Sequence, residues 1–311
     1  RVRSSAASDV YKRQVLWGAD RLTDGAVAVA EKMKMPQIVI GLTIVAMGTS
    51  MPEFCVSFIS ALKGTSDLAV GNIVGSNIFN ALLIVGVSAL VAPMTIMKTT
   101  VRKDIPFALV ASALLLIMCL DGDISRLDAG ILFVMFLIFM YMTLKGAKKQ
   151  GADAEEAIEG EGKKPMATWL SVVWILVGLL CLIGGSNLFV EGATAVATNL
   201  GVSEAVIGLT IVAGGTSLPE LATSVVSARK GNSGIEIGNA LGSNVFNILA
   251  ILGITGMITP MTLKGITYID LSMLVLSIML VWLFSFTKYK IERWEGAVLT
   301  AVFVGYIYSL L

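Results

Sequence analysis

A short apolar segment that occurs twice constrains the fold of this chain more than any other feature. Residues 41–53 read GLTIVAMGTSMPE and residues 208–220 read GLTIVAGGTSLPE, so 11 of 13 positions are identical at an offset of 167 residues. Each copy begins as an apolar helix and ends at a proline, which has no N–H to donate and therefore breaks a helix. The chain is thus expected to contain two related halves, each with one broken helix.

The residue after each proline, Glu53 or Glu220, is the first candidate for function. A carboxylate inside a membrane segment costs at least ~2.5 kcal/mol unless it faces a partner or a wet cavity. Hydroxyl groups precede both prolines, at Thr49, Ser50, Thr216 and Ser217. Carboxylate and hydroxyl oxygens gathered at a helix break indicate a binding site for a hard cation.

The composition places these segments in a membrane. Of the 311 residues, 56% are hydrophobic and 14% are charged, whereas a typical soluble protein has about 25% charged residues. The chain has no histidine, which excludes histidine-based catalysis, metal sites and proton relays. Its three cysteines lie singly in apolar segments, so we interpret them as packing residues rather than a disulfide or metal set. No basic run is interleaved with aromatic residues, and nothing therefore indicates a nucleic-acid partner.

Hydropathy and length divide the chain into ten segments that can cross a bilayer, for which about 20 apolar residues are needed. They lie at about 15–31, 37–62, 68–92, 104–121, 127–145, 167–198, 203–229, 233–258, 268–287 and 294–311. Because five is an odd number, the second five helices must enter the membrane in the opposite direction to the first. The predicted fold is an all-α polytopic membrane protein with ten transmembrane helices in two inverted five-helix repeats.

The offset also predicts the domain organisation. Residues 15–145 form the first half, residues 146–166 a polar linker and residues 167–311 the second half. A full apolar helix precedes Gly185, whereas the matching residues before Gly18 are polar and basic. We therefore expect residues 1–14 to be a non-native leader and the first transmembrane helix to be truncated. The alternative is a genuine polar extension before a short helix.

The loop charges predict the orientation. On the ten-helix topology, the loops of one face carry fifteen Lys and Arg residues and the loops of the other face carry three. The positive-inside rule assigns the basic face to the cytoplasm. We expect a multi-pass protein of the cell (inner) membrane with a cytoplasmic linker and both termini outside.

A second motif follows the first in each half. Residues 71–80 read GNIVGSNIFN and residues 238–247 read GNALGSNVFN, with seven of ten positions identical. On a helix, the spacing of four residues places the polar side chains on one stripe, Asn72, Ser76 and Asn80 in the first copy and Asn239, Ser243 and Asn247 in the second. These groups either line the cation site or hold helices together, and the second role is at least as strong for Asn72 and Asn239.

The paired GTSxPE and GNxxGSNxxN motifs resemble the two α-repeats of the sodium/calcium exchanger family, within the calcium/cation antiporter superfamily. The resemblance covers nearly all of residues 15–311 and is strongest to the short bacterial members. It implies an ion site built from the two broken helices and the helices that follow them. The implied metal ligands are Glu53 and Glu220, the hydroxyls of Thr49, Ser50, Thr216 and Ser217, the side chains of Ser76, Asn80, Ser243 and Asn247, and the carbonyls of Ala46 and Ala213.

One position departs from the pattern of some relatives, which have aspartate where this chain has Asn247. With asparagine in both copies, the implied site has two carboxylates rather than three. In this respect the chain resembles the potassium-independent members of the family.

The function that the resemblance implies is secondary active antiport of Na⁺ and Ca²⁺ by alternating access. The ions are substrates, no cofactor is expected and no obligatory protein partner is evident. The alternative is a calcium/proton antiporter with the same glutamates as proton acceptors, although the hydroxyls before each Pro-Glu pair favour sodium. A passive cation channel is a weaker alternative. An intramembrane peptidase would need a histidine partner or two aspartates, so we do not expect an enzyme.

For the transport cycle, we expect the first and sixth helices to slide against the remaining eight. Small residues would keep that sliding surface smooth, and the candidates are Gly18, Gly25, Gly184, Gly185 and Gly192.

Overall fold

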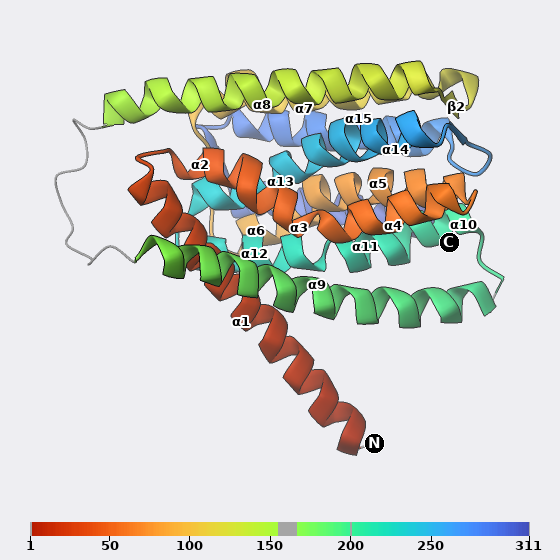
Figure 1. Cartoon of the computed structure of the whole chain (residues 1–311), viewed down its shortest axis with the longest axis horizontal. Helices are drawn as coiled ribbons and strands as arrows, with labels where there is room; N and C mark the ends of the chain where they lie inside the picture. The colour runs from red at the N-terminus through yellow and green to blue at the C-terminus, as the bar shows by residue number, and fades with distance from the viewer. Residues whose placement is uncertain (1, 155–166, 200, 311) are drawn as a thin grey trace.

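The computed structural model of this chain describes residues 2–154, 167–199 and 201–310. It is a bundle of helices with two very short sheets, so the predicted all-α fold is confirmed (Figure 1). Most of the predicted linker, at 155–166, lies outside the described residues.

The first half contains helical segments at all the predicted places. Its elements are α1 (Val2–Lys32), α2 (Gln37–Ile40), η1 (Gly41–Val45), α3 (Ala46–Thr49), α4 (Met51–Leu62), α5 (Ser66–Ile78), η2 (Phe79–Ile84), α6 (Val85–Val91), η3 (Thr100–Asp104), α7 (Ile105–Met118), η4 (Cys119–Asp121) and α8 (Arg126–Ala154). The second half repeats this order except that it has no counterparts of η3 and η4. Its elements are α9 (Thr168–Asn199), α10 (Glu204–Ile207), η5 (Gly208–Val212), α11 (Ala213–Thr216), α12 (Leu218–Arg229), α13 (Ser233–Val245), η6 (Phe246–Ile251), α14 (Leu252–Ile258), α15 (Tyr268–Ser285) and α16 (Arg293–Leu310).

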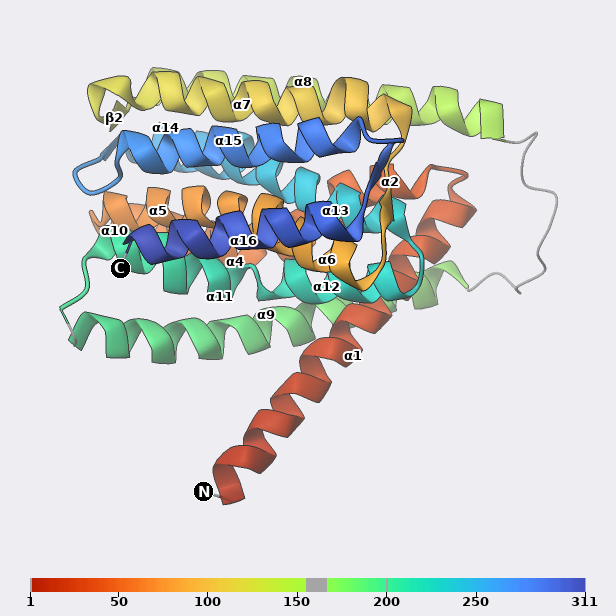
Figure 2. The ribbon, with the colours of Figure 1, turned by 180° about the vertical axis from the view of Figure 1, so that it is seen from behind.

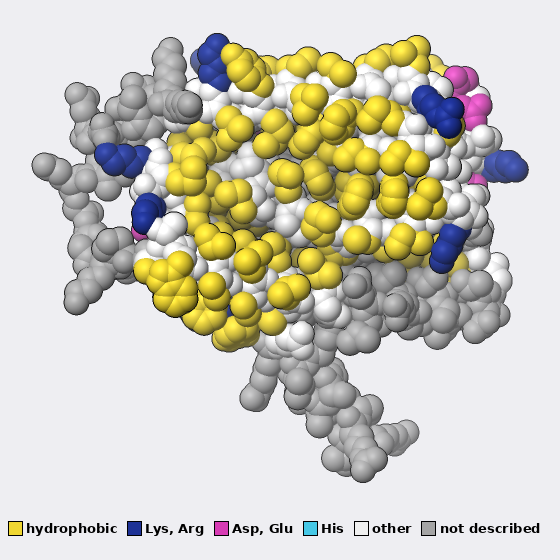
Figure 3. Space-filling model, in the orientation of Figure 1, with side chains coloured by type: hydrophobic (Ala, Val, Ile, Leu, Met, Phe, Trp, Pro, Cys, Tyr) yellow, Lys and Arg dark blue, Asp and Glu magenta, His cyan; other side chains and the backbone are white. Residues whose placement is uncertain are grey.

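The helices suit a membrane in length and composition. Among the described residues, five helical runs are long and apolar enough to cross a bilayer, namely Ser66–Val91, Thr100–Asp121, Arg126–Ala147, Ser233–Ile258 and Tyr268–Ser285. Two further pairs, Gln37–Thr49 with Met51–Leu62 and Ala205–Thr216 with Leu218–Arg229, would each span it as one broken helix. On the face seen in Figure 3, apolar side chains cover the middle of the molecule and basic ones lie toward its two ends. The chain is thus a multi-pass membrane protein, and ten crossings remain a prediction.

Two helical runs form the centre of the bundle. Within Ser66–Val91 and Ser233–Ile258, 78% and 83% of the most apolar window is buried, against 17% for Arg126–Ala147. The central runs carry the second repeated motif, which places its polar residues inside the protein rather than against lipid.

The two halves are related by an approximate twofold exchange. Strand β1 (Met94–Thr95) pairs with β4 (Lys290–Ile291), and β2 (Asp123–Ile124) pairs with β3 (Met261–Thr262), both antiparallel. The 167-residue offset converts β1 into β3 and β2 into β4, so each sheet joins one half to the other in an equivalent way. Such reciprocal contacts are the signature of a twofold relation.

Close backbone contacts interleave the halves. Helix α13 lies against η1, and α5 lies against η5. Glycines permit this approach, because a Cβ added at Gly41 would lie 2.9 Å from the Cα of Gly238. A Cβ at Gly208 would similarly lie 3.3 Å from the backbone of Gly71. Each broken helix is therefore packed on the second-motif helix of the other half.

Helix α1 is continuous from Val2, and its N-terminal part projects away from the bundle (Figures 1 and 2). The predicted helix at 15–31 lies within it. Nothing in this geometry tests whether residues 1–14 are a non-native leader or whether the helix is truncated, and both remain predictions.

The packing of α1 differs from the sliding surface expected for its glycines. Gly18 and Gly25 face α9 rather than the remaining helices, and a Cβ at Gly25 would lie 2.7 Å from Ser171 O. These two glycines thus hold α1 close to α9. An added Cβ at Gly184 meets nothing within 4 Å. Gly185 and Gly192 lie outside the residues whose surroundings the structure describes, so the expectations for these two glycines stay predictions.

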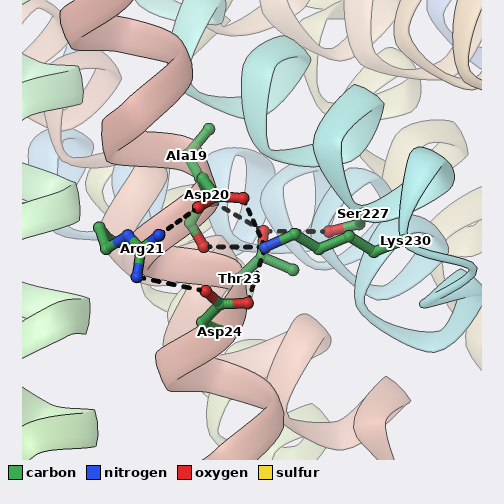
Figure 4. A network of polar contacts seen from close by, with 7 residues as sticks. All are labelled: Ala19, Asp20, Arg21, Thr23, Asp24, Ser227 and Lys230. Atoms are coloured by element: carbon green, nitrogen blue, oxygen red, sulfur yellow. Dashed lines mark hydrogen bonds and ion pairs between the residues drawn. The ribbon is translucent and has the colours of Figure 1, made fainter.

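An ion-pair network also joins α1 to α12 (Figure 4). Lys230, directly after α12, lies 2.6 Å from a carboxylate oxygen of Asp20 and 2.7 Å from one of Asp24. Arg21 pairs with the same two carboxylates at 2.7 and 3.6 Å. Because α12 begins at the second Pro-Glu pair, this network connects α1 to the helix that carries Glu220.

The interleaved packing predicts a cost for enlarging Gly75. A Cβ there would lie 2.4 Å from Leu209 O and 2.7 Å from the Cβ of Ala213. We expect Gly75→Ala to lower the free energy of unfolding by ~1–3 kcal/mol, as overpacking does, measured as thermal unfolding in detergent. The control is Gly305→Ala on α16, where an added Cβ meets nothing within 4 Å. Equal melting temperatures for the two variants would contradict the interleaved packing.

Candidate ion-binding site

Both broken helices break at the serine two residues before the proline. Ser50 and Ser217 have nearly identical backbone angles, φ −83° with ψ 9° and 8°. Each starts a new helix, and the two helical parts of each run are bent by 46° and 44°. Glu53 and Glu220 therefore lie in the first turn of α4 and α12, where the helix dipole favours a negative charge.

Crossed hydrogen bonds bring the two carboxylates into one site. Ser50 Oγ donates to Glu220 Oε1 at 2.9 Å, and Ser217 Oγ donates to Glu53 Oε1 at 3.0 Å. Both glutamates are fully buried. Each carboxylate is thus held by the break in the other half, and neither faces lipid or bulk water.

Asn72 and Asn239 connect the helices around this site. Thr49 Oγ1 donates to Asn239 Oδ1 at 3.0 Å, and its counterpart Thr216 donates to Asn72 Oδ1 at the same distance. Each amide nitrogen donates to the backbone carbonyl of the glutamate in its own half, at 3.3 Å. The amides are used in contacts between helices, which fits the structural role expected for them.

The remaining polar residues of the second motif contact a carboxylate, a broken helix or each other's helix. Ser243 Oγ donates to Glu220 Oε1 and Ser76 Oγ donates to Ala213 O, both at 3.4 Å. Asn80 and Asn247 are both fully buried, and each donates to an asparagine on the central helix of the other half. The structure therefore brings the predicted side chains of both motifs together.

Two asparagines that sequence reasoning missed complete the network. Asn77 and Asn244 each donate to the other's backbone carbonyl at 3.2 Å. Their side-chain oxygens accept from the site residues, Asn77 Oδ1 from Asn247 and Asn244 Oδ1 from Asn80, both at 3.0 Å. Their identical place in both copies of the GSN sequence was the signal that could have revealed them.

Four oxygens of the site have no partner within the protein. They are buried acceptors among the described residues that accept no hydrogen bond, namely Glu53 Oε2, Glu220 Oε2, Asn80 Oδ1 and Asn247 Oδ1. They form two pairs related by the 167-residue offset. A buried acceptor without a donor costs about 1–3 kcal/mol, and a cation is the partner that would satisfy several such oxygens together.

The carbonyls of Ala46 and Ala213 have a different status. Each already accepts the backbone N–H of the break serine at 3.0 Å. Each also lies 3.3 Å from the threonine hydroxyl of its own motif. A role as ligand would therefore require each carbonyl to give up its contact with a side-chain hydroxyl, because a carbonyl oxygen has only two lone pairs.

The donor set also limits the kind of ion. Among the described residues there is no group of three or more His, Cys, Asp or Glu side chains that could hold a metal ion. The site instead combines two carboxylates with amide and hydroxyl oxygens, which suit hard cations rather than transition metals.

Four π-helical turns surround the site in two related pairs, η1 with η5 and η2 with η6. The first pair precedes the Thr-Ser break, and the second pair contains Asn80 or Asn247. Such turns are frequent at functional sites, because they realign side chains without ending the helix.

The fold and the site together define a class of protein. They describe a polytopic helical membrane protein whose two related halves contribute equally to one buried polar site, the organisation of secondary transporters.

Comparisons with known proteins specify the family. The family described as "Sodium/calcium exchanger protein" matches residues 14–145 and 170–311. The chain is 38% identical to the protein CaxA of Alkalimonas amylolytica, covering 95% of both chains. It is 30% identical to the sodium/calcium exchanger MaX1 of Methanosarcina acetivorans, covering 94% of both. A solved structure of the sodium-calcium exchanger NCX_Mj, soaked with Na⁺ and Ca²⁺, superposes with a TM-score of 0.81 at 30% identity over 97% of this chain and 96% of that one.

This chain belongs to the sodium/calcium exchanger family, which confirms the resemblance seen in its motifs. Members of the family are transporters rather than enzymes, and the ions are their transported substrates rather than cofactors.

The asparagine pair predicts an effect on stability. Asn77→Ala removes the acceptor of Asn247 Nδ2 and the donor to Asn244 O, and both groups are buried. We expect a loss of ~1–3 kcal/mol in the free energy of unfolding, the cost of unsatisfied buried groups. The control is Ser112→Ala, whose hydroxyl donates to Ala108 O within its own helix. Thermal unfolding measures both variants, and a stable Asn77→Ala protein would contradict the assigned contacts.

Proposed function

We propose that this chain exchanges Na⁺ for Ca²⁺ across the membrane by alternating access, with the ions bound between Glu53 and Glu220. The observation that carries the proposal is the set of four unpartnered oxygens, two carboxylate and two amide, contributed equally by the two halves. The crossed serine contacts support it, because they aim each carboxylate at the other half.

The charges explain why two kinds of ion would compete. Two carboxylates cancel the charge of one Ca²⁺, so the loaded site is neutral in a medium of low dielectric constant. The empty pair would leave two buried negative charges without compensation, which is strongly unfavourable. The carrier therefore changes sides with Ca²⁺ or with Na⁺ bound, and this requirement couples the two fluxes.

The amides at Asn80 and Asn247 set the charge of the site. Because asparagine occupies both equivalent positions, the site holds two negative charges and not three. We propose that this balance makes the exchange independent of potassium.

The movement would involve α1 and α9 as one unit. The contacts of Gly18 and Gly25 hold α1 against α9, so the pair can shift together past the remaining helices. The bonds from Lys230 to Asp20 and Asp24 would then have to break or rearrange during the cycle.

The loop charges support a proposal for the orientation. We propose that the face with fifteen Lys and Arg residues is cytoplasmic. The linker at 146–166 would then lie inside the cell and both termini outside. A cysteine placed in this linker would be shielded from an impermeant reagent in intact cells.

Calcium/proton exchange is the second candidate. The fully buried Glu53 and Glu220 each have one oxygen that could carry a proton. Protonation would neutralise the empty site as well as sodium does, so the same geometry supports either coupling ion.

The coupling ion can be tested in sealed membrane vesicles. An imposed sodium gradient should drive Ca²⁺ in the opposite direction at constant pH and potassium, because both ions use the same oxygens. Radioactive calcium uptake measures the flux, with sodium, potassium and pH varied separately. Uptake that follows a pH gradient and ignores sodium would replace the sodium proposal with the proton one.

The role of the carboxylates can be tested by Glu53→Gln and Glu220→Gln. Removing one of the two charges leaves the divalent ion uncompensated, so we expect Ca²⁺ affinity to fall about a hundredfold or more and flux to be lost. Glu295→Gln is the matched control, because Glu295 is also fully buried but accepts from Glu292 N at the start of α16. Normal flux in either site variant would remove that residue from the site.

A further inference from the structure

A third buried carboxylate lies outside the site between Glu53 and Glu220. Glu236, in the first turn of α13, is 1% exposed and lies within the apolar run Ser233–Ile258. Its Oε1 has no hydrogen-bond partner, and among the described residues it forms no ion pair. A buried ionisable side chain without a partner in a membrane segment is costly and marks a functional site.

The register of the α12–α13 hairpin shows where the polar side chains of the two helices meet. Ser243 Oγ donates to Glu220 Oε1 at 3.4 Å, and one turn away Asn239 Nδ2 donates to Ser224 Oγ at 3.2 Å. From the first pair to the second, the positions change by four residues in opposite directions on the two helices. The helices are therefore antiparallel, and their polar side chains pair turn by turn.

The next turn pairs Glu236 with Ser227. A step of three residues on each helix completes two turns from the first pair and reaches these two residues. Two backbone hydrogen bonds connect them through Asn232, whose N–H donates to Ser227 O at 2.9 Å and whose carbonyl accepts from Glu236 N at 3.1 Å. A row of paired polar residues thus extends from the central site toward the α12–α13 turn.

The hydroxyl of Ser227 can supply an oxygen to a cation. Ser227 is fully buried, and its Oγ lies 3.3 Å from Thr23 Oγ1 on α1 (Figure 4). Because Thr23 donates its own hydrogen to Ala19 O at 2.8 Å, Ser227 is the donor in this contact. Both lone pairs of Ser227 Oγ therefore remain available, and hydroxyl with carboxylate oxygens suits a hard cation.

The row ends at the ion-pair network between α1 and α12. Lys230 lies three residues beyond Ser227 and pairs with Asp20 and Asp24, whose side chains are 34% and 35% exposed. The loop charges support a cytoplasmic position for this end of the hairpin. The row of polar residues thus connects the buried site with the solvent on the side that we propose to be cytoplasmic.

The first half has no such carboxylate. The 167-residue offset converts Ser227 into Ser60 but Glu236 into Ala69, which is also fully buried. The buried charge is therefore a property of the second half and not a by-product of the repeat. The fold also accepts alanine at this place, which provides a matched variant.

We propose that Glu236 and Ser227 form a second cation site, which holds one Na⁺ between the central site and the cytoplasm. One carboxylate cancels the charge of Na⁺, whereas Ca²⁺ would leave a buried positive charge without compensation. The choice of Na⁺ rests on the proposed function, and its side of the membrane rests on the proposed orientation. Na⁺ that enters from the cytoplasm would bind at Glu236 before it reaches Glu220.

The site can be tested by equilibrium binding of radioactive Na⁺ to the purified full-length chain at constant pH and ionic strength. In Glu53→Gln with Glu220→Gln, which removes the central charges, we expect one Na⁺ per chain to remain bound. Adding Glu236→Gln or Glu236→Ala should weaken this binding about tenfold or more. Glu31→Gln, which removes an exposed carboxylate near the same end of the bundle, is the control and should leave it unchanged.

Three results would overturn the proposal. Absence of Na⁺ binding in the variant without central charges would show that a proton alone neutralises Glu236. Residual Na⁺ binding that survives both Glu236 variants would place the ion elsewhere. Loss of binding that comes with an equally lowered melting temperature in Glu236→Gln and Glu236→Ala would assign Glu236 a structural role.

A transport measurement tests the side of the membrane. In sealed vesicles of either orientation, Glu236→Gln should raise the half-saturating Na⁺ concentration at the cytoplasmic face about tenfold and leave the value at the outer face unchanged. An equal change at both faces would contradict a site on one side. Failure of a sodium gradient to drive Ca²⁺ in the wild type would reject the proposed function, whereas the binding comparison tests Glu236 without transport.

Discussion

The structure depends on two buried carboxylates that are held by each other's half of the chain. Ser50 fixes Glu220 and Ser217 fixes Glu53, at 2.9 and 3.0 Å. Neither half could position its own glutamate in this way if it folded alone. The crossed contacts explain why the polar residues of the second motif are so deeply buried, since every helix around the site must satisfy groups from both halves.

This constraint connects packing with chemistry. Glycines at the crossings let each broken helix approach the central helix of the other half, as Gly41 does with Gly238. The close approach brings Asn77 and Asn244 into mutual contact and leaves the oxygens of Asn80 and Asn247 turned toward no donor. A cation is the natural partner for such oxygens beside two carboxylates, because hydroxyl and amide groups alone cannot neutralise the charge.

The sequence was sufficient to predict the broken helices and most of the residues that gather at the candidate site. Prolines before Glu53 and Glu220 marked the breaks, and the 167-residue offset identified the second-motif residues that the structure brings together. The sequence could not reveal that each serine contacts the glutamate of the other half, because the spacing of residues along one helix does not say which helix packs against it. For the same reason, Gly18 was expected to face the remaining helices although it packs on α9. The π-helical turns also depend on tertiary packing and leave no local signal in the sequence.

The most direct test of the central claim is to locate a divalent ion in crystals of this chain soaked with Sr²⁺, by anomalous scattering. The account predicts one strong peak between Glu53 and Glu220, within coordination distance of both carboxylates and lost when Na⁺ is raised. A peak at one carboxylate alone, or only at a position away from both, would contradict it.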